Sequence, residues 1–200
     1  MRIVMSRSFT RAEPDARRQS LIEAAARVLA ERGAAGASVR TICAEAGVSP
    51  GLLRHYFDGI DALIAATYAW TDEKVSRWLS EAVQAAGDDP RARLFAYVTA
   101  SFRKPIADAQ LLATWIAFWS LIKARPDMER LHAEIYGSYR RELESLLVAC
   151  GVSREAAPHA AIAVTALVDG LWLELCLAPQ AFSAEEAGAI AERWIDTMLR

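Results

Sequence analysis

The segment 44–57, AEAGVSPGLLRHYF, decides how the rest of the chain is interpreted. Gly47 separates two short apolar stretches, and Ser49 and Pro50 open the second one. Ser49 is a favoured N-cap residue, and Pro50 fits the first turn of a helix, where a missing N–H is tolerated. Upstream, residues 39–46 form a helical pattern that ends at the glycine. Two short helices joined by a tight glycine turn make up a helix-turn-helix.

The second helix carries large polar side chains that a buried helix does not need. In a helix-turn-helix, this helix lies in the major groove of DNA. Arg offers paired donors to phosphate or guanine, while His and Tyr donate to phosphate oxygens. We therefore expect DNA binding, although a three-helix packing unit with a solvated polar face is the alternative. With Val48, Leu53 and Phe57 inward, the outward residues are Ser49, Pro50, Gly51, Leu52, Arg54, His55 and Tyr56, and Arg40 can reach the same surface.

The hydrophobic pattern is helical throughout, and no stretch shows sustained β-strand alternation. The sequence therefore predicts an all-α fold of about nine helices. A three-helix DNA-binding domain with a flexible N-terminal arm is expected over 1–57, and a helical ligand-binding and dimerisation domain over 58–200. The expected helices run from about 15 to 32, 39 to 46, 50 to 56, 58 to 86, 90 to 102, 108 to 124, 126 to 150, 153 to 177 and 183 to 200.

The charges are unevenly distributed along the 200 residues. Residues 1–57 contain nine Arg or Lys and five Asp or Glu, a net charge of +4, whereas the remainder contains 14 and 20, a net charge of −6. A basic N-terminal segment on an otherwise acidic chain suggests that the N-terminal segment faces nucleic acid. Arg2, Arg7 and Arg11 form either a flexible basic arm or a disordered start with incidental charge.

The segment 159–177 is apolar enough to imitate a membrane span. It carries Asp169 and Glu174, however, and an acid at the centre of a membrane helix costs about 2.5–3.5 kcal/mol. We expect a buried or subunit-interface helix and no membrane partner. The N-terminal apolar run is too short for a signal peptide. Three isolated cysteines without metal-ligand spacing also indicate the reducing cytoplasm.

The segment 17–63 resembles the DNA-binding domain of TetR-family transcriptional regulators, in the stretches IEAAARVLAERG, SVRTICAEAGVSPG and HYF. The remainder has the length and helical layout of the family's dimeric ligand-sensing domain. One position departs, because Ile60 stands where the family commonly has a Lys, which puts one phosphate contact in doubt. Arg54 supplies a charge where an aromatic or small polar residue is usual. By this resemblance the DNA-facing positions are Ser38, Arg40, Ser49, Pro50, Gly51, Leu52, Arg54, His55 and Tyr56.

Three further stretches resemble one branch of the family, the choline-responsive BetI repressors. These are LIAAT at 63–67, WIAFW at 115–119 and DGLWL at 169–173. The resemblance implies an inducer such as choline or another quaternary ammonium. Aromatic faces attract such cations through the ring quadrupole.

The aromatic residues of WIAFW share one helix face, which fits either a core stripe or a ligand pocket between helices. For the pocket we predict a cage with Glu174 or Asp169 as counter-charge, although Asp169 fits a dimer interface equally well. A plain core stripe, with an apolar inducer bound elsewhere, is the competing hypothesis. The predicted ligand-binding residues are Trp70, Tyr97, Trp115, Phe118, Trp119, Trp172 and Glu174.

The sequence contains no recognisable catalytic or metal-binding motif, and no cofactor is expected. We therefore predict a ligand-responsive repressor that binds a palindromic operator as a homodimer. The dimer is expected to form through helices 153–177 and 183–200, because the first is too apolar to face water. The alternatives are an all-helical enzyme or a partner-binding helical protein with a helix-turn-helix appendage.

Overall fold

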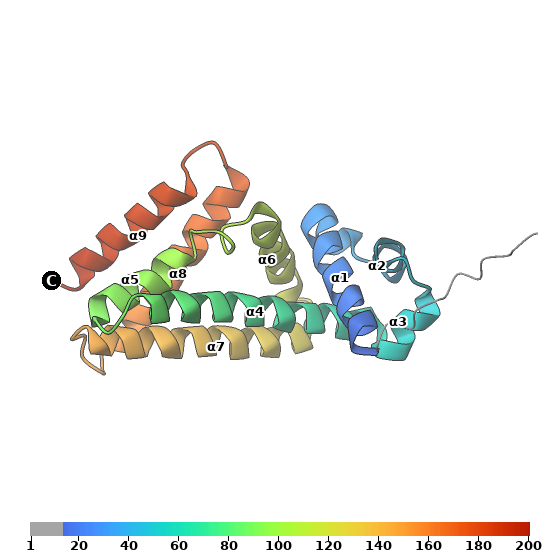
Figure 1. Ribbon diagram of the computed structural model, residues 1–200, viewed down its shortest axis with the longest axis horizontal. Coiled ribbons are helices and arrows are strands. Elements are labelled where there is room, and N and C mark those ends of the chain that lie inside the picture. The colour runs from blue at the N-terminus through green and yellow to red at the C-terminus, as the bar shows by residue number, and fades with distance from the viewer. Residues whose placement is uncertain (1–13) are drawn as a thin grey trace, which may run out of the picture.

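The computed structural model describes residues 14–200, so the expected arm with Arg2, Arg7 and Arg11 lies outside the described residues. This part of the chain is all-helical, as predicted (Figure 1). Helices α1–α3 form one end of an elongated molecule, and α4 and α7 run along its length. The helices are α1 (Pro14–Gly36), α2 (Val39–Ala46), α3 (Pro50–Tyr56), α4 (Gly59–Ala85), α5 (Pro90–Ala100), α6 (Ala109–Ile122), α7 (Pro126–Ala149), α8 (Ala157–Leu177) and α9 (Ala184–Met198).

Capping residues set most helix ends near their predicted positions. The Ser38 side chain accepts from the backbone N–H of Thr41 and forms a capping box at the start of α2. Gly47 ends α2 with φ of 64°, a left-handed conformation that glycine adopts without a Cβ clash. Gly33 has φ of 63° and interrupts α1 where the sequence predicted its end.

The end of α1 and the start of α8 differ from the prediction, and α1 continues past the kink at Gly33 to Gly36. Helix α8 begins at Ala157 rather than near Ser153, because the Ser153 hydroxyl accepts from the N–H of Ala156 and closes a separate turn. Helix α3 ends at Tyr56, as predicted, because Phe57 has extended backbone angles and places its ring in the core.

The buried apolar residues form two clusters. The smaller one holds α1–α3 together and includes Leu21, Ile42, Leu53 and Phe57. The larger one lies among α4–α9. Helix α4 contributes to both clusters, with Leu63 in the smaller one and residues after 63 in the larger. The proposed division at residue 57 therefore falls just before a helix that both units share.

Helix α8 is long and apolar enough to cross a membrane by length and composition, a test that core helices of soluble proteins also pass. Here Val164, Val168 and Trp172 on one side of α8 are buried in the larger cluster. The structure therefore accounts for the apolar character of this side by packing within the protein.

Candidate DNA-binding surface and ligand pocket

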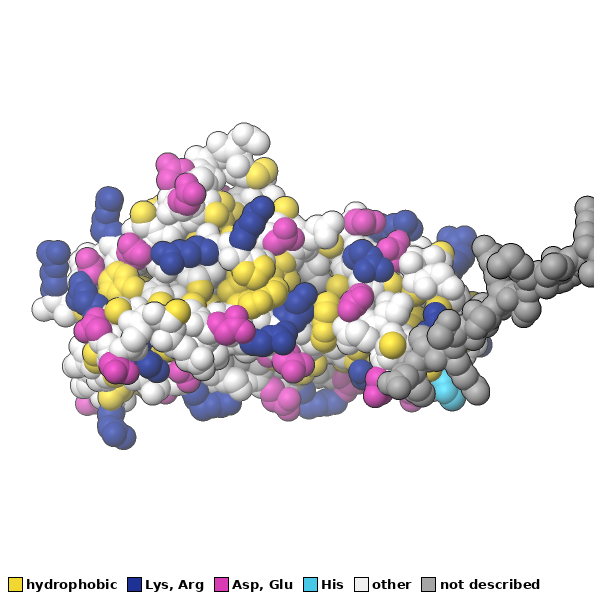
Figure 2. Space-filling view, in the orientation of Figure 1, with side chains coloured by type: hydrophobic (Ala, Val, Ile, Leu, Met, Phe, Trp, Pro, Cys, Tyr) yellow, Lys and Arg dark blue, Asp and Glu magenta, His cyan; other side chains and the backbone are white. Residues whose placement is uncertain are grey.

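Helix α3 presents a polar face at the end of the molecule. Leu53 anchors the helix in the smaller cluster, and the hydroxyl of Ser49 accepts from the N–H of Leu52 at its start. Arg54 and His55 are exposed, whereas Tyr56 is half-buried with its ring 4.9 Å from that of His55. In Figure 2, Lys, Arg and His side chains appear at this end of the molecule. Donors of this kind on a protruding helix suit contact with phosphates and base edges.

Arg40 and Ser38, two further candidate DNA-facing residues, differ in whether their side chains are free to contact DNA. Arg40 is exposed on α2 beside this face. The Ser38 hydroxyl, by contrast, is engaged with the Thr41 N–H and hydroxyl in the capping box. Ile60, in place of the usual Lys, is half-buried and packs against both apolar clusters. Its side chain therefore has a structural role at the base of α4.

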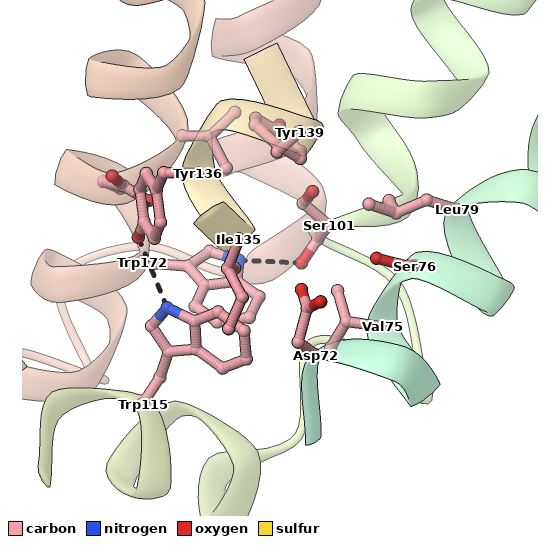
Figure 3. Close-up of a pocket in the computed structure, with 12 residues that line it drawn as sticks. Asp72, Val75, Ser76, Leu79, Ser101, Trp115, Ile135, Tyr136, Tyr139 and Trp172 are labelled. Atoms are coloured by element: carbon pink, nitrogen blue, oxygen red, sulfur yellow. Dashed lines mark hydrogen bonds between the residues drawn. The ribbon is translucent and has the colours of Figure 1, made fainter. Parts of the chain in front are cut away.

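A cavity of about 50 Å³ lies among α4, α6, α7 and α8 (Figure 3). This is room for several water-sized groups, which suits a small ligand. Trp115 and Trp172 form part of its wall and meet edge to face, with ring centroids 5.9 Å apart. The Trp172 indole N–H donates to the carbonyl oxygen of Ser101 at 2.9 Å, which fixes the ring. The lining residues are Asp72, Val75, Ser76, Leu79, Ser101, Trp115, Ile135, Tyr136, Tyr139, Val168, Asp169 and Trp172.

The hydroxyl of Tyr136 connects the aromatic wall to a carboxylate. It accepts from the indole N–H groups of Trp115 at 3.3 Å and Trp119 at 3.0 Å. The same hydroxyl donates to Oδ1 of Asp169 at 3.2 Å. The guanidinium carbon of Arg140 lies 5.8 Å from the centroid of the Tyr136 ring. Because every hydrogen-bonding position of the hydroxyl is used, the orientation of the ring is fixed.

Two acidic side chains line the cavity, one from α4 and one from α8. Burial raises the pKa of Asp169 to about 6, while the hydrogen bond from Tyr136 and the nearby Arg140 act in the opposite direction. Burial also raises the pKa of Asp72. None of the lining residues is a Lys or Arg. The site thus combines π faces with a surplus of negative charge, which favours a cation.

Comparisons with known proteins match this architecture. Residues 21–67 match the family described as "Bacterial regulatory proteins, tetR family", and residues 90–200 match "BetI-type transcriptional repressor, C-terminal". The HTH-type transcriptional regulator BetI of Paraburkholderia phytofirmans is 35% identical over 186 residues, covering 92% of this chain and 93% of the relative. The chain belongs to the TetR family, in its BetI-type group. It is a transcriptional repressor of this type, and the relatives named here are regulators rather than enzymes.

Solved structures of TetR-family proteins and other regulators share the fold. A putative transcriptional regulator from Pseudomonas aeruginosa PAO1 has a TM-score of 0.86 and 42% identity, covering 96% of this chain and 94% of the other. A putative regulator from Saccharomonospora viridis, solved in complex with choline, has a TM-score of 0.80. It is 19% identical and covers 91% and 96% of the two chains, so its likeness shows the fold alone.

In this BetI-type repressor the predicted ligand residues separate into three groups. Trp115 and Trp172 line the cavity. Trp119 is half-buried and supports the cavity through Tyr136, whereas Phe118 is fully buried and stacks on Tyr68 at 4.5 Å. Tyr97 is buried and stacks on the lining residue Tyr139 at 5.2 Å. Trp70 lies in a different groove, and Glu174 is exposed and does not line the cavity.

Most lining residues of the cavity were absent from the predicted set, and three of those, Asp72, Tyr136 and Tyr139, carry titratable groups. Asp72 lies four residues after the buried Tyr68 and three before Val75, so its place on the inward side of α4 was a readable signal. Tyr136 and Tyr139 lie seven and four residues before the buried Leu143 on α7. Helical spacing therefore predicts that each of these side chains faces inward. It does not predict that α4, α7 and α8 meet at one cavity.

Proposed function

We propose that this repressor binds a palindromic operator as a homodimer and releases it when a small cation occupies the cavity. The observation that carries the proposal is the pairing of Trp115 and Trp172 with two acids, Asp72 and Asp169, around one small cavity. We propose choline or another quaternary ammonium as the cation. The choline complex of the S. viridis regulator supports this choice only as a precedent in the same fold.

The chemistry of the lining favours a permanent cation whose charged group donates no hydrogen bond. Each aromatic face contributes about 0.5–2 kcal/mol to cation binding, depending on desolvation. The Tyr136 hydroxyl donates to the carboxylate of Asp169 and fixes its position. The carboxylate therefore needs no hydrogen-bond donor from the ligand. The proposed contact residues are therefore Trp115, Trp172, Tyr136, Asp72 and Asp169, and they replace Trp70 and Glu174 in the predicted cage.

The exposed apolar residues support the proposed dimer. The large hydrophobic side chains that stay exposed in the described part of the chain are Ile162, Leu173, Leu177, Ile190 and Trp194, and all of them lie on α8 or α9. Packing α8 and α9 against a second copy would form a four-helix bundle and remove this surface from water. A two-fold dimer would present two copies of α3 to a palindromic operator about one helical turn apart, or a multiple of that spacing. We expect this assembly in the cytoplasm.

Release of DNA requires that the cation bind two conformations unequally. A ligand shifts such an equilibrium only by its difference in affinity for the two states. The cavity is lined by α4, and α4 also contributes to the cluster that holds α3. A ligand that changes the position of α4 would therefore change the spacing of the two recognition helices.

Calorimetry with a matched pair of ligands tests the proposal. Choline and 3,3-dimethylbutan-1-ol have nearly the same shape, but only choline is charged. We expect choline to bind and to release operator DNA in a fluorescence anisotropy assay, and the neutral analogue to do neither. Equal binding of both compounds, or no binding of choline at millimolar concentration, would contradict a cation site.

A further inference from the structure

A second concavity lies where the DNA-binding helices meet the rest of the protein. It is an open groove of about 480 Å³ between α1, α4 and the start of α6. Its walls include Glu23 and Arg27 from α1, Trp70, Lys74 and Trp78 from α4, and Gln110 from α6. The groove is larger than the cation cavity and shares none of its lining residues.

The α4 side of the groove is a stripe of two indoles with one ammonium between them. Trp70, Lys74 and Trp78 are spaced four residues apart, so they follow one side of the helix. The Lys74 Nζ lies 4.4 Å from the centroid of the Trp70 ring and 5.3 Å from that of Trp78. In Figure 2 a basic side chain lies between two hydrophobic patches over the middle of α4. All three side chains are only half-buried and thus remain accessible.

The other charged residues of the groove already have partners. Glu23 accepts from the Gln19 amide at 3.0 Å, and Arg27 pairs with Glu45 at 2.7 Å. The Asp108 carboxylate accepts from two backbone N–H groups at the start of α6. Lys74 makes no salt bridge with a carboxylate among residues 14–200. Lys74 is therefore the cation of the groove without a carboxylate partner among residues 14–200, and it lies beside two aromatic faces. The partners of Glu23 and Asp108 are neutral groups.

We propose that this groove is a second ligand site, which binds a flat aromatic carboxylate. The ammonium of Lys74 would pair with the carboxylate of such a ligand and leave an indole face of Trp70 or Trp78, on which the ring of the ligand would stack. Aromatic stacking adds about 0.5–1.5 kcal/mol beyond area burial, and a charge-assisted hydrogen bond is stronger than a neutral one. A quaternary ammonium is disfavoured at this position because the ammonium of Lys74 would repel it.

Occupation of this groove would be coupled to DNA binding. One wall, α1, contributes mainly to the cluster that supports α3, and only its Leu29 belongs to the larger cluster, in which the α6 wall packs. A ligand that contacts both walls favours one relative position of them. By linkage, operator DNA must then change the affinity for the aromatic carboxylate by the same factor as the carboxylate changes the affinity for DNA.

Calorimetry with benzoate as the probe tests the site. We expect saturable binding to the full chain, with benzyl alcohol and acetate binding much more weakly because each lacks either the charge or the ring. Lys74→Met keeps most of the length of the side chain and removes the charge, so it should weaken benzoate binding about tenfold. Lys74→Arg should retain binding. Lys123→Met, at an exposed lysine paired with Glu129 away from the groove, is the matched control.

Two outcomes would overturn the site. One is an absence of saturable benzoate binding at millimolar concentration, and the other is equal affinity in the wild type and Lys74→Met with far-UV circular dichroism unchanged. The site is independent of the proposed cation cavity, so choline should neither displace benzoate directly nor lose affinity in Lys74→Met. Failure of choline binding would therefore leave this inference standing, and failure of benzoate binding would leave the cation proposal standing.

Discussion

Asp169→Asn should make the protein more stable and a poorer cation binder at the same time. The carboxyl group lies in the cavity, accepts from the Tyr136 hydroxyl at 3.2 Å and has its pKa raised by burial. An ionised carboxylate in this position is unfavourable for the folded state, yet it is the charge that a bound cation would neutralise. An asparagine oxygen can still accept from Tyr136 without the charge.

The magnitude follows from the pKa. A rise from 3.8 in the unfolded chain to about 6 in the folded protein corresponds to about 3 kcal/mol. The folded state holds the proton more tightly, so the contribution of this group to stability is fully present below pH 3.8 and is lost as pH rises to about 6. Above that window, Asp169→Asn should exceed the wild type by up to about 3 kcal/mol, less the cost of a poorly paired amide N–H₂ group.

Urea unfolding at pH 5 and pH 8, followed by circular dichroism, measures the stability difference, and calorimetry measures choline binding. We expect choline affinity to fall tenfold to a hundredfold, about 1.5–3 kcal/mol. Wild-type affinity should also fall below about pH 6 as Asp169 takes up a proton. Glu174→Gln, an exposed change on the same helix, is the control and should alter neither quantity. A variant no more stable than the wild type at pH 8, with unchanged choline affinity, would refute this reasoning.

Further predictions concern the DNA surface, the cavity and the dimer. Arg40→Ala and Tyr56→Ala should each weaken operator binding by about 1–3 kcal/mol in anisotropy titrations, and wild-type affinity in both would show the surface to be misassigned. Ile60→Lys should add about one phosphate contact per subunit and so steepen the salt dependence of DNA binding. The aliphatic part of the lysine can keep the packing of Ile60. An unchanged slope would place position 60 away from DNA. Tyr136→Phe leaves two indole N–H groups and Asp169 without their partner, so the free energy of unfolding should fall by about 1–3 kcal/mol. As the pH is lowered, choline binding should be lost at a higher pH than in the wild type. An unchanged pH dependence of choline binding would contradict the role of the hydroxyl. Leu177→Glu combined with Trp194→Glu should give monomers in ultracentrifugation with intact helicity, and a persisting dimer would exclude α8 and α9 as the interface.

Local sequence signals predicted the helices well because caps act over three or four residues. Ser38, Ser49, Asp89 and Ser183 all accept from a backbone N–H at a helix start. The start of α8 was misplaced because a serine followed by three residues can close an isolated turn just as well as a helix. Which of the two forms depends on packing that the local sequence does not contain.

The cavity was only partly predictable, for a related reason. Periodicity indicates which side of one helix is buried, but it does not indicate which other helix covers that side. Trp115 and Trp172 were therefore found, whereas Trp70 lies on the α1 side of α4 rather than facing α7 and α8. Glu174 lies five residues after Asp169, so the two carboxylates point to different sides of α8, and only Asp169 reaches the cavity.

Helix α4 is long and straight enough to act as a rigid rod. A small displacement of α4 at the cavity would therefore also move its end beside α3. Its 27 residues span about 40 Å, and after Gly59 they include no glycine or proline at which the axis could bend. A tilt of about 5° around its middle would move each end by nearly 2 Å. Glycine substitutions that keep the helical register, Ala66→Gly with Ala69→Gly, should thus make α4 more flexible between Leu63 and Asp72 and weaken the coupling of the cavity to α3, while choline and operator DNA each still bind.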